Sequence, residues 1–244
     1  MSEFQEEIDE RSHVRTEEEL DAEALVVLQS NFSPSGNEME SETAEKQSFN
    51  EIRLERLYFD LKLVKGVDNI VTISCFFQLF DVWIGMYRLS KCFKELEEIK
   101  PIILNSVILR EKFEFKLIQS LAFTYWKLSK YSKAIEHFKQ LETLLNGSES
   151  AALYENMGFT YSAMGDFENA ERYLKKSLSM GASGGTLLGL GQVLQRKGAV
   201  AEGLEFSLQA LQFYESRFSK NEKMPSLGPS SLEAKCAQCV SRYF

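Results

Sequence analysis

The sequence predicts an all-α protein built from helical hairpins that repeat along the chain. Apolar residues recur at helical spacing from residue 51 onward. No segment shows the alternation of apolar and polar residues that is typical of a half-buried strand. Between residues 115 and 218, small, large and turn-forming residues recur in the same order three times. A helical period combined with an internal repeat favours a stack of helix pairs.

The first 50 residues differ in composition from the rest of the chain. The 244 residues carry a net charge of −8, and most of the excess acid lies in residues 1–50. Few of these residues are aromatic, which predicts an acidic disordered arm. Within the arm, the apolar run from Leu20 to Leu28 predicts either local residual helix or a short segment that docks on a partner or on this protein's own groove. No stripe of Arg and Lys is present, so a nucleic-acid partner is not expected.

The N-terminus is acidic and lacks the apolar stretch of a secretory signal. Four cysteines in 244 residues are too few for a disulfide scaffold. We therefore expect a cytoplasmic location, with the nucleus as the alternative. The apolar run 70–86 is short for a membrane span and contains Asp81, so we expect a buried helix and no membrane insertion.

Residues 51–114 predict a helical region that is either a degenerate repeat or a different kind of helical hairpin. The polar turn at 66–69 separates two apolar helical segments. A third segment begins near Leu89. We expect it to end at Ile99, because the residue before Pro101 disfavours the helical conformation.

Residues 115–218 predict three hairpins, over 115–150, 151–183 and 184–218. Two antiparallel helices that cross closely need a small residue at the crossing on each helix. The residues at these places are Ala122, Gly158 and Gly191 on the first helices and Ala134, Ala170 and Gly203 on the second helices. Gly165 and Gly198 follow a first helix, where a left-handed residue ends the helix, and Ser129 stands there in the first hairpin.

This pattern resembles the tetratricopeptide repeat family. The segment from Ala151 to Gly184 matches the family's repeat of about 34 residues except for its closing proline. The resemblance implies a short right-handed superhelix of hairpins with a C-terminal capping helix. Residues 219–244 contain a linker and then an apolar stripe suited to such a cap, formed by Leu232, Cys236, Cys239, Val240 and Tyr243.

The resemblance implies a non-enzymatic adaptor or scaffold, a subunit of a larger complex that binds a segment of a partner protein. In the family, residues of the first helices line a concave groove. Carried over residue by residue, that groove consists of Lys116, Gln119, Phe123, Trp126, Lys127, Glu155, Asn156, Phe159, Leu188, Gln192, Gln195 and Arg196.

A co-chaperone of the Hsp70/Hsp90 type is the alternative function. One branch of the family binds the C-terminal carboxylate of these chaperones with a lysine, two asparagines and a further lysine-arginine pair. Asn156 matches one of the asparagines. Gln119, Phe123, Gly185 and Gly189 stand at the other places, so most of the clamp is absent.

The residues that carry chemistry elsewhere do not form a catalytic or metal-binding pattern. Cys236 and Cys239 have the spacing of a zinc half-site or a redox pair, but no second ligand pair accompanies them. His137 has no matching nucleophile motif. The glycines of 184–191 lack the lysine and the preceding strand of a phosphate loop. We therefore predict no enzyme activity, no cofactor and no metal, and assign these residues to packing.

Overall fold

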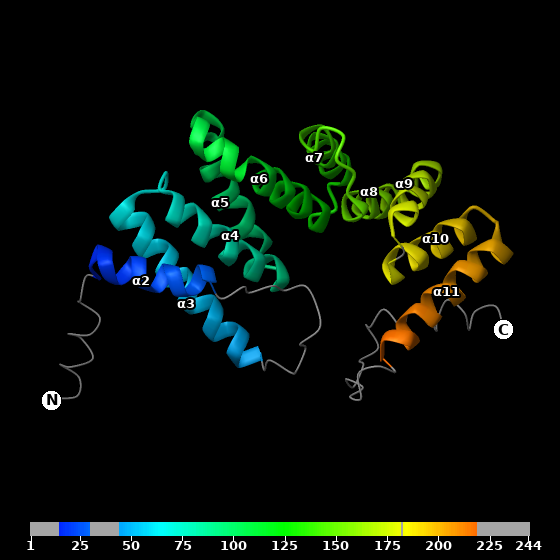
Figure 1. Cartoon of the computed structure of the whole chain (residues 1–244), viewed down its shortest axis with the longest axis horizontal. Coiled ribbons are helices and arrows are strands. Elements are labelled where there is room, and N and C mark those ends of the chain that lie inside the picture. The colour runs from blue at the N-terminus through cyan, green and yellow to red at the C-terminus, as the bar shows by residue number, and fades with distance from the viewer. Residues whose placement is uncertain (1–14, 30–43, 182, 219–244) are drawn as a thin grey trace. The chain divides into compact units, whose positions relative to one another are not determined.

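The computed structural model describes residues 15–29, 44–181 and 183–218, in which helices are joined by short turns and loops (Figure 1). The described residues form helices α2 to α11 and contain no strand, which confirms the predicted all-α class. The chain divides into two compact units, Met1–Leu117 and Ile118–Phe244, which are considered one at a time below. The capping helix predicted within residues 219–244 lies outside the described residues.

Aromatic side chains form the core of the first unit. The helices of this unit are α2 (Glu17–Gln29), α3 (Ala44–Lys65), α4 (Ile70–Gly85), α5 (Leu89–Asn105) and the start of α6 (Val107–Lys127). Asn69 caps α4 by accepting a hydrogen bond from the backbone N–H of Val71 at 2.8 Å. The rings of Tyr58 and Phe76 lie 5.7 Å apart, and Trp83 is buried. Because most of α4 is buried, the apolar run 70–86 is a core helix, and no described helix is long and apolar enough to cross a membrane.

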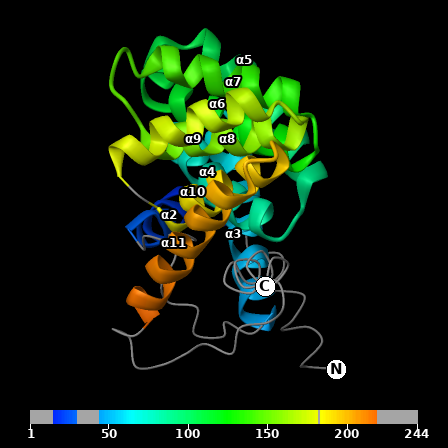
Figure 2. The ribbon, with the colours of Figure 1, turned by 90° about the vertical axis from the view of Figure 1, so that its right-hand side faces the viewer.

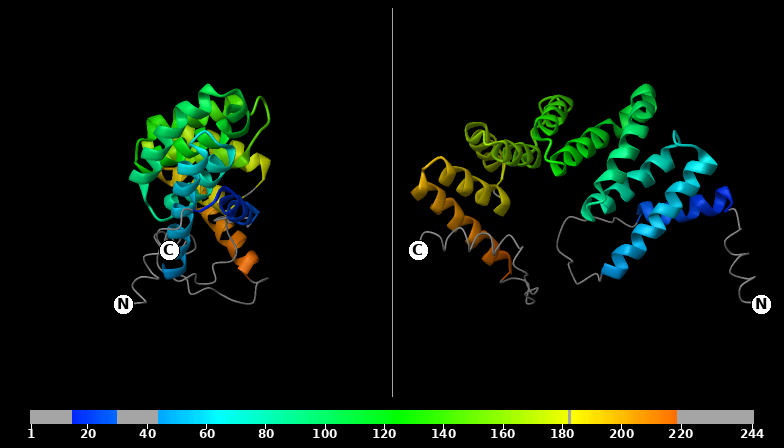
Figure 3. Two further views of the ribbon diagram at one scale, coloured as in Figure 1. Left: turned by 90° about the vertical axis from the view of Figure 1, so that its left-hand side faces the viewer. Right: turned by 180° about the vertical axis from the view of Figure 1, so that it is seen from behind.

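Two parts of the predicted disordered arm, residues 17–29 and 44–50, are helical in the structure, and residues 1–14 and 30–43 lie outside the described residues. Residues 17–29 form α2, whose Leu20, Ala24 and Val27 are buried, and α2 packs on both α3 and α4. Helix α3 already begins at Ala44. In the views of Figures 1 and 3, α2 lies across α3. The short apolar run near the N-terminus therefore docks on this protein's own helices.

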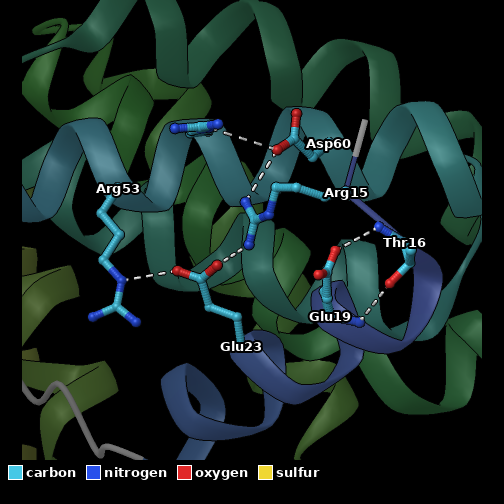
Figure 4. A network of polar contacts seen from close by, with 7 residues as sticks. Arg15, Thr16, Glu19, Glu23, Arg53 and Asp60 are labelled. Carbon is cyan, nitrogen blue, oxygen red and sulfur yellow. Dashed lines mark hydrogen bonds and ion pairs between the residues drawn. The ribbon is translucent and has the colours of Figure 1, made fainter. Parts of the chain in front are cut away.

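Polar contacts on both sides of α2 fix its position on α3. Thr16 and Glu19 form a capping box, in which each side chain accepts a hydrogen bond from the backbone N–H of the other residue. Arg15 donates to Asp60 of α3 at 3.0 Å and also pairs with Glu23 (Figure 4). At the C-terminal end of α3, the Lys65 ammonium lies 2.5 Å from an Asp21 carboxylate oxygen.

Helix α5 continues through Pro101, so the prediction that it ends at Ile99 is wrong. A proline within a helix removes one backbone donor and crowds the preceding turn, at a cost of roughly 3 kcal/mol. Ile99 and Ile103 on either side of the proline are fully buried. Their burial offsets the local cost, since each buried aliphatic side chain contributes about 1.5–3 kcal/mol.

The second unit is built from antiparallel helix pairs. Besides the end of α6 it contains α7 (Tyr131–Leu144), α8 (Ala151–Met164), α9 (Phe167–Met180), α10 (Gly184–Arg196) and α11 (Val200–Phe218). Helices α8 and α9 pack on each other, as do α10 and α11 (Figures 1 and 2). These two pairs lie within the ranges 151–183 and 184–218.

The small residues stand where the helices of each pair cross. A Cβ on Gly158 would lie 2.6 Å from Cγ of Leu174, which is closer than real Cβ contacts. A Cβ on Gly191 would lie 2.8 Å from the carbonyl oxygen of Gly203 on α11. Ala134 is fully buried on α7. The predicted crossing positions therefore correspond to places where a larger side chain has no room.

One turn geometry joins the two helices of each pair. Ser129, Gly165 and Gly198 have φ angles of 58°, 82° and 89°. After each of them, a backbone N–H donates to the carbonyl oxygen five residues earlier, at 2.9 to 3.0 Å. This is the Schellman arrangement that ends a helix with a left-handed residue. Tyr87, between α4 and α5 of the first unit, has the same φ of 58° and the same bond, from Arg88 at 2.8 Å.

Candidate functional site

The predicted groove residues all lie on the first helices of the hairpins. The five from the first hairpin are on α6, the three from the second are on α8, and the four from the third are on α10. Helices α8 and α10 contact each other directly. The first helices of these two hairpins therefore form one continuous surface within the second unit.

Two glycines of α10 set the distance between α8 and α10. A Cβ on Gly185 would lie 2.6 Å from a carboxylate oxygen of Glu155, and one on Gly189 would lie 2.4 Å from the ring of Phe159. Ser183 also donates a hydrogen bond to Glu155 at 2.8 Å. Glu155 and Phe159 are therefore half-buried against the next repeat. From the sequence we predicted a packing role for these glycines, but the sequence did not show which side chains pack against them.

Three of the predicted groove residues make contacts inside the protein instead. Leu188 is only 4% exposed and belongs to the core between α10 and α11. The Lys116 ammonium lies 3.0 Å from the carboxylate of Asp81 in the first unit. Gln195 donates to the hydroxyl of Ser207 on α11 at 3.4 Å. We therefore leave Leu188, Lys116 and Gln195 out of the candidate site.

The remaining residues define what we call the first-helix surface of the second unit. Its three aromatic residues, Phe123, Trp126 and Phe159, are each half-buried. Its cations are Lys127, whose ammonium lies 5.5 Å from the Trp126 ring centre, and the exposed Arg196. Aromatic residues and arginine are enriched at the centre of protein interfaces, whereas a lysine such as Lys127 is more typical of the rim. The complete set is Gln119, Phe123, Trp126, Lys127, Glu155, Asn156, Phe159, Gln192 and Arg196.

The geometry around His137 indicates a packing role. Its ring stacks on Tyr125 with centres 5.4 Å apart and planes 7° from parallel. Its Nδ1 lies 3.0 Å from the amide oxygen of Gln140. In the next hairpin, Tyr173 stacks on Tyr161 at the same 5.4 Å and 6°. His137 therefore occupies the place of a structural tyrosine in the repeat.

The described cysteines are buried in the first unit and are poorly suited to act as nucleophiles. Burial raises the pKa of the Cys75 thiol to about 12, and it raises the pKa of Cys92 to about the same value. Only the thiolate attacks or binds a metal, and at neutral pH both groups carry their proton. Across the described ranges, no three His, Cys, Asp or Glu side chains are arranged to hold a metal ion. Cys236 and Cys239 lie outside the described residues.

Sequence reasoning missed a buried polar cluster in the first unit. Glu95 of α5 is buried, and it accepts hydrogen bonds from the hydroxyl of Tyr58 at 2.8 Å and from the ammonium of Lys62 at 3.1 Å. Burial, together with the bond to Glu95, raises the pKa of Tyr58. Glu95 lies in a charged run of sequence that resembles a solvated face, so no local signal marks it as buried. The cluster is fully paired and positions α3 on α5.

Known proteins match the repeat region in sequence. A family model described as tetratricopeptide repeat matches residues 116–183. The Cell division cycle protein 16 homologs of Homo sapiens and Mus musculus are each 33% identical to this chain over 85 residues. This match covers 35% of the chain but only 13% of the length of these relatives. The chain therefore spans only a small part of the length of these relatives.

Solved structures match most of the fold. TPR-like repeats assigned to a kinesin light chain of Podosopora anserina align with a TM-score of 0.60 and 12% identity, covering 87% of this chain and all of that one. BtubC from P. vanneervenii aligns with a TM-score of 0.54 and 16% identity, covering 88% of this chain and 84% of that one. At such identities the likeness concerns the fold alone. The crossing residues, the turn geometry, the matched family model and these folds agree: residues 116–183 match the tetratricopeptide repeat family, and the chain has the fold of TPR-like repeat proteins.

Proposed function

We propose that this protein is a non-enzymatic adaptor or scaffold that binds a segment of a partner protein on its first-helix surface. The observation that carries the proposal is the placement of Phe123, Trp126 and Phe159 on the first helices, half-buried and bordered by polar side chains. Aromatic residues held in this way can supply most of the energy of an interface, because they bury a large area at small entropic cost.

The charges of the first-helix surface indicate the chemistry of the partner segment. Lys127 and Arg196 are its cations. Its one carboxylate, Glu155, already accepts a hydrogen bond from Ser183. We therefore propose a segment with apolar side chains for the aromatic residues and acidic side chains for the cations, bound as a helix or as an extended strand.

The structure gives a physical reason to rank the co-chaperone alternative lower. The chaperone clamp of the resembled family needs cations where Gly185 and Gly189 stand. These two glycines are covered by Glu155 and Phe159 of the neighbouring helix. A longer side chain at position 185 would have to displace the Glu155 carboxylate, and one at position 189 would have to displace the Phe159 ring.

The test is affinity purification of the full chain with identification of what is retained, followed by titration of the purified partner. Trp126→Ala should weaken binding by about thirtyfold or more, since an aromatic anchor at an interface centre carries roughly 2 kcal/mol. The single variant Arg196→Glu should also weaken partner binding if the partner segment is acidic. Lys139→Glu is the matched control, because Lys139 is an exposed cation on the second helix α7.

Circular dichroism and thermal melting of Trp126→Ala separate a binding role from a core role. Loss of affinity with the melting temperature within a few degrees of the original chain supports the proposal. Loss of stability with unchanged affinity per folded molecule removes Trp126 from the site. Recovery of no specific partner in any condition would count against an adaptor.

We further propose a reducing compartment, the cytoplasm first and the nucleus second. Cys75 and Cys92 are free thiols in the core of the first unit. Unpaired cysteines are typical of proteins that stay in contact with cytosolic reductants. Imaging of the tagged full chain tests the location, and its appearance in a secretory compartment would contradict the proposal.

A further inference from the structure

The outer face of α3 carries an apolar stripe that nothing in the described part of the chain covers. Ile52, Phe59 and Leu63 are 63%, 46% and 83% exposed. With Arg56 they follow the spacing i, i+4, i+7 and i+11, which is one narrow face of a helix. The opposite face of α3 is buried in the first unit through Leu54, Leu57, Tyr58 and Leu61. Helix α3 is therefore apolar on two faces, and the protein covers only one of them.

The neighbours of α3 border this stripe, and on the α2 side Arg15 and Glu23 line a shallow pocket with Ile52 and Arg56. On one side, Arg53 pairs with Glu23 of α2 at 2.9 Å. On the other side, Lys62 pairs with Glu98 of α5 at 2.6 Å. Leu63 stands between these two rows of ion pairs. A row of large apolar side chains with a polar rim is typical of a surface that another helix covers.

We propose that a second copy of this chain covers the stripe with its own α3, packed antiparallel about a two-fold axis. The stripe is complementary to itself in this orientation. The midpoint between positions 52 and 63 is also the midpoint between positions 56 and 59, and it falls between Leu57 and Tyr58. An antiparallel pair centred there places Ile52 against Leu63 of the second copy. It also places Arg56 over the Phe59 ring of the second copy, which is a favourable cation–π contact.

The charges beside the stripe agree with the same register. Arg56 and Asp60 lie along one side of it, and Glu55 and Lys62 lie along the other. In an antiparallel pair about this axis, each side of the stripe meets the same side of the second copy. Arg56 then lies near Asp60 of the second copy, and Glu55 lies near Lys62 of the second copy. Asp60, Glu55 and Lys62 also keep partners in their own chain, which are Arg15, Lys91 and Glu98. A parallel pair would instead set Arg56 against Arg56 in the seam.

Arg56 is free to make these contacts at small cost. Its side chain is 64% exposed, and its ion pair with Asp60 spans 3.9 Å, at the outer limit of such pairs. The contact between two helices of this length is small for a stable interface, so we expect a reversible dimer in the micromolar range. The inference rests on the first unit alone and is independent of the proposed function.

Sedimentation velocity of the full chain, from low micromolar to several hundred micromolar, tests the dimer. The unmodified chain should shift from monomer to dimer across this range. Leu63→Glu, at a highly exposed site that burial on folding does not constrain, should weaken the dimer at least tenfold. Val107→Glu is the matched control, because Val107 is 73% exposed and lies off the stripe. A monomer at all concentrations, or a dimer that Leu63→Glu leaves intact, overturns the proposal.

Cysteine cross-linking tests the register. A mixture of an Ile52→Cys chain with a Leu63→Cys chain should form a disulfide-linked dimer much faster than either chain alone. In the proposed register, position 52 of one copy and position 52 of the other would lie about 16 Å apart along the helix axis, beyond the roughly 7 Å that a disulfide spans. The unmodified chain under the same oxidation gives the background of its own cysteines. Equal cross-linking of the Ile52→Cys chain with itself overturns the antiparallel pairing.

Discussion

Gly191→Ala should destabilise the second unit more than the same change at Gly158. The added Cβ at position 191 would lie 2.4 Å from the Ser207 hydroxyl and 2.8 Å from the Gly203 carbonyl oxygen. The carbonyl belongs to the backbone of α11, so relief requires that the whole helix move. At Gly158 the first obstacle is the side chain of Leu174 at 2.6 Å, which can rotate in part.

The expected magnitudes follow from two opposing effects. Overpacking a filled core costs about 1–3 kcal/mol, and more when the neighbour cannot yield. Replacing glycine by alanine within a helix returns about 1 kcal/mol. We expect a net loss of about 2 kcal/mol at Gly191 and of about 0–1 kcal/mol at Gly158. Gly85→Ala is the control, because a Cβ there meets no atom within 4 Å, and it should be neutral or slightly stabilising.

Urea denaturation of the full chain measures these differences. The chain has two tryptophans, and Trp126 reports on the second unit while Trp83 reports on the first. Gly191→Ala should lower the urea midpoint seen by Trp126 and leave that of Trp83 nearly unchanged. A melting temperature lowered by several degrees should accompany it, since 1 kcal/mol corresponds to roughly 4–8 °C for a unit of this size. A Gly191→Ala protein as stable as the original would refute the close crossing of α10 and α11.

Three further predictions concern Asp166, the two buried cysteines and Tyr87. Asp166→Ala should cost about 1 kcal/mol, because the Asp166 carboxylate caps α9 by accepting from the backbone N–H of Asn169 at 3.1 Å. The side-chain bond to Asn169 lowers the folded-state pKa of Asp166. Its contribution is therefore complete above the unfolded-state pKa and is lost as the pH falls through the folded-state pKa, so Asp166→Asn should flatten this part of an acid titration of stability. Cys75 and Cys92 should resist alkylation at neutral pH and react in urea, as followed by peptide mass spectrometry, because burial raises the pKa of both thiols to about 12. Tyr87→Gly should stabilise the first unit by about 0.5–1 kcal/mol in urea denaturation, because Tyr87 has a φ of 58° that glycine adopts without strain.

The fold could be predicted because the residues that pack at each helix crossing recur at fixed spacings within a single hairpin. The small residue of each first helix and the small residue of its partner helix stand twelve positions apart in all three hairpins, as in the pair Gly158 and Ala170. Such a pattern is readable within one hairpin. The burial of Leu188 was not readable in this way, because it depends on how closely α10 packs on α11. A residue of α8 in the same register, Glu155, remains half-exposed.

The sequence offered docking of α2 only as one alternative, and it could not identify the helices on which α2 packs, for a similar reason. Its composition is that of a solvated acidic segment, with Glu17, Glu18 and Glu19 in its first turn. Its burial depends on Leu20, Ala24 and Val27 meeting α3 and α4, which follow it in the sequence. Two acidic side chains of α2 form ion pairs with α3, Glu23 with Arg53 and Asp21 with Lys65. Composition alone therefore indicates that burying these acidic residues is unfavourable. It does not reveal the basic and apolar residues of α3 and α4 that compensate for this cost.

The turn at Tyr87 bears on the nature of residues 51–114. In the three hairpins, the left-handed turn residue follows the small residue of the first helix by seven positions, as Gly165 follows Gly158. Seven positions before Tyr87 stands the buried Phe80, where the other hairpins have alanine or glycine. Five positions after Tyr87 stands Cys92, at the place of Ala170.

We infer that α4 and α5 form a degenerate hairpin of the same kind, in which a large residue occupies the crossing. A buried phenylalanine at this position would hold two helices further apart than a glycine does, in agreement with α4 packing more extensively on α3 than on α5. A search for small residues at the crossing therefore passes over this hairpin. Its turn keeps the backbone geometry of the repeat, because a Schellman bond needs only a left-handed residue and no particular side chain. Phe80→Ala would separate the two possibilities, since in a degenerate repeat it leaves a cavity that α5 can approach to fill, at less than the roughly 3–5 kcal/mol that loss of a rigidly held phenylalanine costs.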